Sequence, residues 1–273
     1  MSQIYEKLLR CVDSVRSKTD FVPHVGLVLG SGLGKFAENL ENPFYVNYSD
    51  IEGFPVSTAP GHVGRFVFGY VKGVPVVCMQ GRVHLYEGYS PEDVVLPIRL
   101  MKMLGAKVLF LTNASGAIKH GFHAGDLMLI TGHVATMVPS PLRGENIPEL
   151  GPRFPDMSHV YDEDLQQIAR ACAIECGITL KEGTYFQTPG PAYETPEEVC
   201  MIRTLGGDAV GMSTAIEAIA ANHMGMKIIG ISCLSNLASG ISPTPLSEQE
   251  VIEAGETVAP KFTRLVSEII SRV

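Results

Sequence analysis

Arginine and histidine side chains that could bind an oxyanion follow one of the apolar runs of the chain. The segment "QGRVHLYEG" comes directly after the apolar residues 74–79, and it contains Arg82 and His84. Alternate residues of an extended strand face the same side, so both side chains would point together if the strand continues. Donors of this kind on one face suit an oxyanion, because charge-assisted hydrogen bonds are strong. An ion pair at the surface is the competing interpretation.

A glycine-rich loop near the N-terminus is a second candidate for anion binding. The segment "LVLGSGLGKF", residues 27–36, runs from apolar residues into Gly30, Gly32 and Gly34. Glycine allows backbone N–H groups to approach an anion closely. The spacing does not fit a dinucleotide fingerprint, which requires a glycine where Lys35 stands, and a P-loop requires a longer first interval. The loop therefore suits an anion but not NAD or ATP, and a plain strand-to-helix turn remains an alternative.

Two further segments place a ring, a carboxylate and a hydroxyl before predicted helices. In "PGPAYETPEE", the Tyr193 ring could stack on a heterocyclic base while Glu194 accepts a hydrogen bond from its N–H. A solvated loop carboxylate is the alternative for Glu194. In "GMSTAIEA", Ser213 lies at a strand-to-helix turn, where it could cap the helix or bind an anion.

Amide and small side chains end two other apolar runs. "NASGA", residues 113–117, and "CLSNLASG", with Ser235 and Asn236, occupy positions where ligands bind in α/β sheets. A bare turn explains the first segment equally well. Taken together, the segments supply anion donors, an aromatic ring, a carboxylate and an amide at strand ends, which one sheet could gather into a single site.

The elements that must position these residues follow an alternating α/β pattern. Several apolar runs are continuous, as in a sheet covered on both faces, so we expect a single α/β domain over residues 1–273 with a mixed central sheet flanked by helices. Residues 72–73 should form a hairpin turn, and residues 138–161 a long loop. The predicted strands are 24–29, 65–71, 74–79, 107–112, 126–131, 182–187, 208–212 and 227–233, and the predicted helices are 2–17, 92–104, 162–176, 196–205, 214–224 and 248–271.

Composition limits the classes of protein to which the chain can belong. With 273 residues, 45% of them hydrophobic and 18% charged, the chain is typical of a globular protein. A net charge of −8 without a basic run disfavours nucleic acid and anionic membranes as partners. No apolar stretch has the length of a signal peptide core or a membrane span, so a cytoplasmic protein is expected. The six cysteines lack metal-binding spacing and are interpreted as buried free thiols.

Seven motifs in order resemble one known family. The segments "GSGLG", "PGHVGR", "QGRVHLYEG", "TNASGA", "GPAYETPEE", "DAVGMSTAIEA" and "SCLSNLASG" closely resemble the trimeric, low-molecular-mass purine nucleoside phosphorylases. The resemblance runs from about residue 24 to the C-terminal helix. It implies a nucleoside phosphorylase/hydrolase-like fold, a homotrimer and an enzyme of purine salvage. It also implies no metal and no organic cofactor, because orthophosphate is itself a substrate.

The resemblance assigns roles to individual residues. It implies a phosphate site formed by Ser31, His62, Arg82, His84, Asn113, Ala114 and Ser213. It implies a purine and ribose site formed by Tyr86, Tyr193, Glu194, Met212 and Asn236, with Phe154 lent to the pocket of a neighbouring subunit. Glu194, Asn236 and His84 are the expected catalytic residues. Tyr193 stands where family members often have phenylalanine, and a tyrosine ring still allows stacking.

One position departs from the family pattern. Many members carry a histidine near the ribose 5′-hydroxyl, in a segment that resembles "LSEQEV", and this chain has Glu248 there. Glu248 could accept a hydrogen bond from the 5′-hydroxyl. Alternatively, it follows Ser247, a predicted helix N-cap, and an acid in the first turn favours the helix dipole without any ligand.

The reaction that the resemblance implies needs no enzyme nucleophile. Phosphate would attack C1′ of a purine nucleoside through a transition state like that of glycoside cleavage. Asn236 would donate to N7 and Glu194 would accept from N1–H, which favours inosine and guanosine over adenosine. A methylthioadenosine phosphorylase, associated with aspartate in place of Asn236, is the alternative within the fold. A nucleoside hydrolase and a non-catalytic purine-binding protein are alternatives from other classes.

Overall fold

The sheet that carries the site has nine strands, five of which close into a barrel. The computed structural model describes residues 2–273, and its strand order is β2-β3-β4-β1-β5-β8-β7-β6-β9. An additional pairing between β5 and β9 joins the ends of the series β5-β8-β7-β6-β9, so these strands form a closed ring. The strands are β1 (Val25–Val28), β2 (Glu41–Asn47), β3 (Arg65–Val71), β4 (Val74–Gln80), β5 (Val108–Ala117), β6 (Leu127–Val134), β7 (Leu180–Gln187), β8 (Ala209–Gly211) and β9 (Lys227–Leu237).

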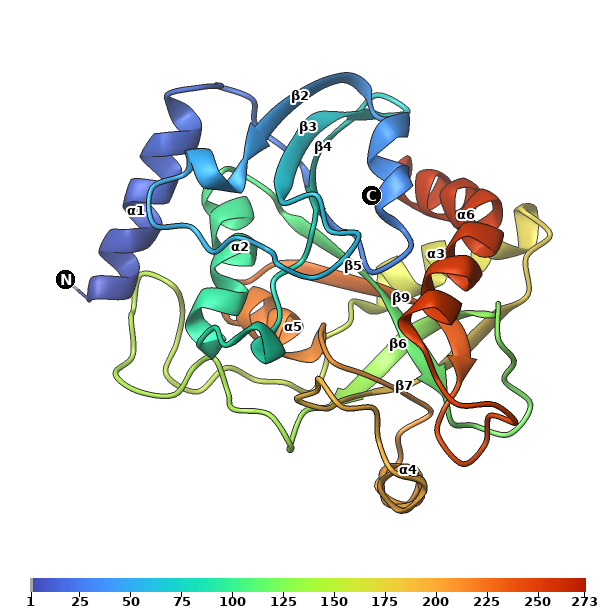
Figure 1. Cartoon of the computed structure of the whole chain (residues 1–273). Helices are drawn as coiled ribbons and strands as arrows, with labels where there is room; N and C mark the ends of the chain where they lie inside the picture. The colour runs from blue at the N-terminus through green and yellow to red at the C-terminus, as the bar shows by residue number, and fades with distance from the viewer. Residues whose placement is uncertain (1) are drawn as a thin grey trace.

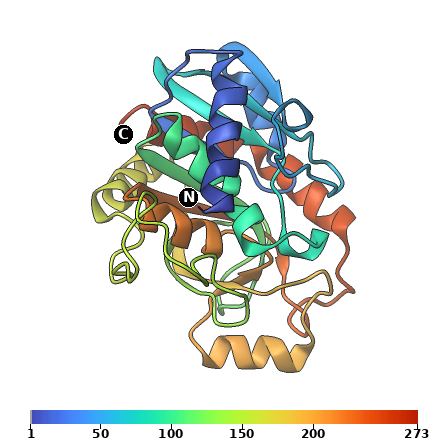
Figure 2. The same ribbon diagram turned by 90° about the vertical axis from the view of Figure 1, so that its left-hand side faces the viewer.

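Helices cover both faces of the sheet, as the continuous apolar runs predict. Helices α1, α2 and α5 lie on one side of the sheet and α3 and α6 on the other, while α4 stands apart beside the barrel (Figures 1 and 2). Each face has its own apolar core, and Leu8, Ile98 and Ala218 belong to one core while Leu165 and Phe262 belong to the other. The helices are α1 (Gln3–Arg16), α2 (Pro91–Met103), α3 (Glu163–Glu175), α4 (Pro196–Thr204), α5 (Ala215–His223) and α6 (Glu248–Ile270).

The eight predicted strands and six predicted helices are confirmed, with three differences. Strand β2 was not predicted, because it is an edge strand with Pro43 inside it and all but one of its residues exposed, which leaves no alternating pattern. Strands β5 and β9 are longer than expected, because they pair with each other through residues 112–117 and 231–237. Residues 113–117 are therefore strand, and the interpretation of "NASGA" as a bare turn is wrong.

Other local predictions have clear outcomes. Strands β3 and β4 form the expected antiparallel hairpin, in which Lys72 and Gly73 both have positive φ. Five cysteines are buried as expected, but Cys200 on α4 is exposed. None of the helices formed by residues 2–273 combines the length and the apolar character needed to cross a bilayer.

Candidate active site

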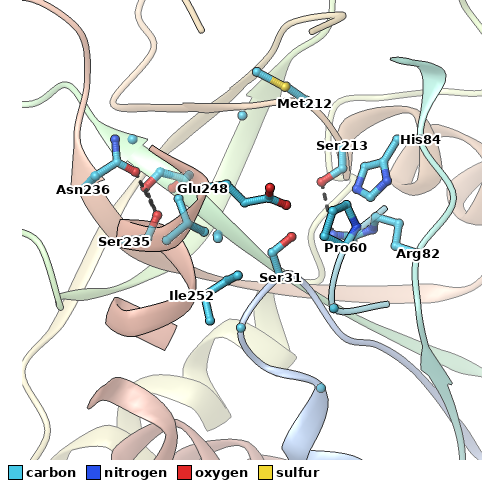
Figure 3. Close-up of a pocket in the computed structure, with 18 of the residues that line it drawn as sticks. Ser31, Pro60, Arg82, His84, Met212, Ser213, Ser235, Asn236, Glu248 and Ile252 are labelled. Atoms are coloured by element: carbon cyan, nitrogen blue, oxygen red, sulfur yellow. Dashed lines mark hydrogen bonds between the residues drawn. The ribbon is translucent and has the colours of Figure 1, made fainter. Parts of the chain in front are cut away.

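A cavity of about 630 Å³ lies where β1, β4, β5, β8 and β9 bring their polar segments together. The first turns of α6 form the opposite wall, and the side chains point inward from strand ends and helix starts (Figure 3). Most of the residues proposed from the sequence line this one cavity: Ser31, Arg82, His84, Tyr86, Ala114, Tyr193, Glu194, Met212, Ser213, Asn236 and Glu248.

The glycine loop after β1 is fixed by two close contacts. A Cβ atom on Gly30 would lie 2.5 Å from the Asn113 Cα atom, so only glycine lets β1 end this close to β5. Gly32 has a φ of +74°, and a Cβ atom there would lie 3.0 Å from the Cα atom of Gly255 in α6. Ser31, between them, is therefore held between the sheet and α6. Gly34 has no neighbour within 4 Å of its Cβ position, so packing requires only two of the three glycines.

Arg82 is buried, and both ends of its guanidinium are engaged. Its Nε–H donates to Glu217 Oε1 at 3.0 Å, and its NH1 group donates to Ser213 Oγ at 3.1 Å (Figure 3). The remaining NH2 group is buried and has no hydrogen-bond partner among residues 2–273. The guanidinium thus has a fixed orientation and an N–H group available for another acceptor.

Two histidines near this arginine are held in defined tautomers. The Nδ1 atom of His84 lies 3.0 Å from Glu87 Oε1, and the Nδ1 atom of His62 lies 2.9 Å from the carbonyl oxygen of Arg82. Carboxylate and carbonyl oxygens only accept, so Nδ1 carries the proton in both rings and Nε2 is left as an acceptor. Burial lowers the pKa of His84 to about 4 against the opposing effect of Glu87, and burial also lowers the pKa of His62. Both rings are therefore neutral near pH 7.

His62 does not line the cavity itself. Its Nε2 atom lies 3.4 Å from Ser31 Oγ, which can donate to it, and its ring centre lies 5.2 Å from that of His84. His62 is therefore within hydrogen-bonding range of the Ser31 hydroxyl, and its place in the phosphate site stays a prediction.

Asn113 also lies behind the cavity wall. Its Nδ2 group donates to Thr214 Oγ1 at 2.9 Å, and its Oδ1 atom accepts from Ser232 Oγ at 2.5 Å. The side chain is 1% exposed and both of its polar groups are engaged by these bonds, whereas Ala114 lines the cavity. Asn113 is thus placed to support the site through Thr214, and its direct contact with phosphate stays a prediction.

The turn before α5 has an unusual backbone conformation. The N-cap residue is Thr214, with a φ of +83°, and not Ser213, so the interpretation of Ser213 as a helix cap is wrong. Positive φ is rare for a β-branched residue and costs about 1–3 kcal/mol, which the surrounding contacts must offset. The Thr214 hydroxyl lies 3.1 Å from Ser213 Oγ and accepts from Asn113. The strained turn directs Ser213 into the cavity.

A carboxylate and an amide also line the cavity. Glu194 is 9% exposed, and its Oε1 atom accepts from Thr188 Oγ1 at 2.7 Å. Asn236 accepts from Ser235 Oγ at 2.9 Å through Oδ1 and donates from Nδ2 to the carbonyl of Leu237 at 2.9 Å. These bonds fix both groups and leave each with further hydrogen-bonding capacity. A capping box formed by Thr195 and Glu198 starts α4 directly after Glu194, which holds the carboxylate in place.

Glu248 enters the cavity from the first turn of α6. Its carboxylate extends into the middle of the cavity, toward Ser31 and Ser213 and away from the Ser235–Asn236 pair (Figure 3). Burial raises the pKa of the Tyr193 phenol, and the negative charge of Glu248 adds to this effect. The carboxylate is therefore electrostatically close to the ring of Tyr193, although Ser247 also caps α6 as the sequence predicted.

Phe154 lies on a loop away from this cavity. It is 87% exposed, on the long loop between β6 and α3. The C-terminal end of α5 holds the loop on both sides of the ring: His223 Nε2 lies 3.0 Å from the Pro152 carbonyl, and Asn222 Nδ2 donates to the Asp156 carbonyl at 2.8 Å. The aromatic ring is thus presented outward on an anchored loop.

Sequence reasoning missed several residues that support the site. The position of Glu217 gave the clearest signal, because it is the one charged residue in the apolar stretch 215–221 and follows Ser213 by four residues. Glu87 follows His84 by three residues and could have been identified from that spacing. Thr188 and Thr214 gave no signal, because hydroxyl residues are common in turns.

The whole chain is similar to known proteins in sequence and in fold. Residues 24–271 match the family model described as "Phosphorylase superfamily". "Purine nucleoside phosphorylase 1" of Bacillus subtilis (strain 168) is 48% identical over 267 residues, covering 98% of this chain and 98% of that protein. "Purine nucleoside phosphorylase" of Rattus norvegicus is 41% identical over 276 residues, covering 98% and 96% of the two chains.

Solved structures extend this similarity to three dimensions. The structure of Schistosoma mansoni purine nucleoside phosphorylase in complex with inosine superposes with a TM-score of 0.93 at 34% identity, covering 98% of this chain and 96% of that one. Sequence identity above 40% over nearly the full length, together with this superposition, identifies the family. The chain therefore belongs to the purine nucleoside phosphorylases, a family of enzymes within the phosphorylase superfamily.

Proposed function

We propose that the enzyme cleaves 6-oxopurine nucleosides such as inosine and guanosine by phosphorolysis, giving the free base and ribose or deoxyribose 1-phosphate for purine salvage. The observation that carries this proposal is the convergence of two kinds of group in one cavity. Arg82, Ser213 and Ser31 offer donors to an anion, Asn236 lies across the cavity from Arg82 and Ser213 (Figure 3), and Glu194 also lines the cavity. No metal and no organic cofactor enters this scheme, because orthophosphate is a substrate.

At the anion end, phosphate is bound by oriented donors. The Ser213 hydroxyl, the backbone N–H of Ala114 and the Arg82 guanidinium can donate to its oxygens, and the Ser31 hydroxyl can donate when it turns from His62 Nε2 to the phosphate. The neutral His84 ring accepts through Nε2, so it suits the O–H of a protonated phosphate. The protein thus places the nucleophile and stabilises charge instead of attacking C1′ itself.

At the base end, the hydrogen-bonding pattern selects a 6-oxopurine. Negative charge moves into the purine as the glycosidic bond breaks, and the Asn236 amide can donate to N7. Glu194 can accept from N1–H, which inosine and guanosine carry. Adenine presents a bare acceptor at N1 and would face the carboxylate without a proton between them. The buried position of Glu194 makes that mismatch costly.

A second copy of the chain completes the nucleoside site in this proposal. Phe154 is an exposed aromatic ring on an anchored loop, which is how a residue is presented to a neighbouring subunit. We propose a cytoplasmic homotrimer in which Phe154 covers the ribose in the adjacent cavity.

The test is release of free base with and without phosphate. Inosine should give hypoxanthine only when phosphate is present. Base released without phosphate would indicate a hydrolase, a preference for 5′-methylthioadenosine would indicate the alternative phosphorylase, and no release from any of these nucleosides would indicate a binding protein.

Variants at Glu194 test the base-reading role within this assay. Glu194→Ala should lower kcat/KM for inosine roughly 10- to 150-fold, the cost of a lost charge-assisted hydrogen bond, and leave the KM for phosphate nearly unchanged. Glu197→Ala is the matched control, because that carboxylate is exposed on the same segment and lies outside the cavity. Equal turnover of inosine by Glu194→Ala and the control would refute the assignment.

A further inference from the structure

We propose that Glu217 is a positioning residue for phosphate binding, which holds the Arg82 guanidinium so that its NH1 group is directed at Ser213 in the cavity wall. The two side chains come from positions 135 residues apart in the sequence, and each is 1% exposed. The inference rests on the proposed use of this cavity for phosphate.

The geometry fixes the plane of the guanidinium. A guanidinium group is rigid and planar, so two hydrogen bonds at different corners determine its orientation. Glu217 accepts from Nε at 3.0 Å and Ser213 accepts from NH1 at 3.1 Å. With the first bond removed, rotation about the side-chain torsions would be restrained only by the exchangeable hydroxyl contact.

Glu217 is also the counter-charge of Arg82. It is the carboxylate paired with Arg82 among residues 2–273, and the neutral rings of His84 and His62 add no charge nearby. Around Arg82, the free cavity therefore has a compensated cation and neutral donors, and the carboxylates of Glu194 and Glu248 also line it. Its preference for phosphate depends on the direction of the N–H and O–H groups more than on net positive charge.

Orientation and charge compensation can be separated by comparing the phosphate affinities of two conservative variants. Glu217→Gln keeps the length of the side chain and an oxygen acceptor for Nε, but removes the charge. Glu217→Asp keeps the charge but withdraws the carboxylate by one methylene from Nε. If orientation is the main role, Glu217→Asp weakens phosphate binding more than Glu217→Gln does. If charge compensation is the main role, the order is reversed.

The experiment measures the dissociation constant of inorganic phosphate by isothermal titration calorimetry of the free enzyme, together with steady-state kinetics. We expect Glu217→Asp to raise the phosphate dissociation constant and KM by roughly tenfold, and Glu217→Gln by less than about threefold, with the KM for inosine nearly constant in both. Ile216→Val is the matched control, because it alters the neighbouring buried residue of α5 and makes no hydrogen bond to Arg82.

The outcomes separate this inference from the proposed function. An unchanged phosphate dissociation constant in Glu217→Asp, or a larger loss in Glu217→Gln, would overturn the positioning role. A parallel rise in the KM for inosine and for phosphate would also overturn it, because that pattern indicates general damage to the fold. Wild-type enzyme that binds phosphate but does not cleave inosine would refute the proposed function, while the calorimetric order would still decide the role of Glu217.

Discussion

At the scale of single residues, the groups that face the cavity are each held by a neighbour. His62 contacts Ser31, and Arg82 and Thr214 contact Ser213. Glu87 accepts the Nδ1 proton of His84. Hydrogen bonds lower the pKa of Glu87 to about 2, although burial opposes this shift. Preorganised donors lose little entropy when a ligand binds, which is the arrangement that electrostatic catalysis requires.

A substitution at Asn236 tests how the amide reads the purine. In Asn236→Asp, a carboxylate oxygen would face the Leu237 carbonyl, which now accepts from Nδ2, so the new side chain favours a protonated form or a rotated one. We expect kcat/KM for inosine to fall and the adenosine-to-inosine ratio of kcat/KM to rise. Steady-state kinetics with both nucleosides is the measurement, and an unaltered ratio would remove Asn236 from base recognition.

Glu248 provides a second prediction at the residue scale. Its carboxylate points into the cavity, so we propose that it accepts a hydrogen bond from the ribose 5′-hydroxyl. Sites built to bond a hydroxyl reject its absence strongly, and 5′-deoxyinosine should therefore be a poor substrate. In Glu248→Ala, the inosine-to-5′-deoxyinosine ratio of kcat/KM should decrease. A constant ratio would leave Glu248 only its effect on the helix dipole, which is a few tenths of a kcal/mol in stability.

At the scale of elements, α5 touches both the anion end of the cavity and the loop of Phe154. Its first turn follows Ser213 and contains Glu217, and its last two residues, Asn222 and His223, hold the loop. In the proposed trimer, α5 would therefore link the phosphate site of one subunit to the aromatic residue offered to the next subunit.

A double-mutant cycle tests the role of the loop anchor. Phe154→Ala should raise the KM for inosine several-fold with little change in the KM for phosphate. Asn222→Ala should produce a smaller change of the same kind, because it releases the Asp156 carbonyl and loosens the loop. In the Phe154→Ala background, Asn222→Ala should then add nothing to the KM for inosine. Additive effects would show that Asn222 acts independently of Phe154, and a fully active monomer in sedimentation experiments would contradict the intersubunit role.

At the scale of the whole molecule, an anion must bind to a protein with a net charge of −8. The global field opposes phosphate, so affinity must come from local donors that are buried and oriented. The same burial depresses the pKa values of histidines: it lowers the pKa of His84, despite Glu87, and of His133 to about 4.

The lowered pKa values of His84 and His133 predict a loss of stability in mild acid. Their unfolded pKa is about 6.5, so the unfolded chain binds more protons between pH 6.5 and pH 4, and stability decreases as the pH falls through this window. From pH 7.5 to pH 5, each such histidine contributes a loss of about 2 kcal/mol in the free energy of unfolding. Urea denaturation at fixed protein concentration measures this loss. His133→Gln, which lies outside the cavity, should lose about 2 kcal/mol less than the wild type between the two pH values. If the wild type and His133→Gln lose the same free energy of unfolding between these pH values, the protonation of His133 is not the cause of the loss.

The sequence alone determined the architecture and most of the cavity. Continuous apolar runs predicted buried strands, helical periodicity predicted the covering helices, and "QGRVHLYEG" and "PGPAYETPEE" placed Arg82, His84 and Glu194 at the ends of those elements. These features are local. Side-chain periodicity indicates which face of an element is buried, and capping residues indicate where a helix begins or ends, and both signals extend over only a few residues. The set of motifs in order was also specific enough to indicate the family.

Only the tertiary structure decided which polar residues face the cavity and which support it. Asn113 and Ala114 are adjacent, yet the amide of Asn113 points to Thr214 behind the wall because β5 continues as a strand and alternates its sides. Arg82 meets Glu217 across 135 residues of sequence, which no local pattern records. Such pairings depend on how the closed barrel and α5 pack together, so they follow from the three-dimensional fold and not from the spacing of residues along the chain.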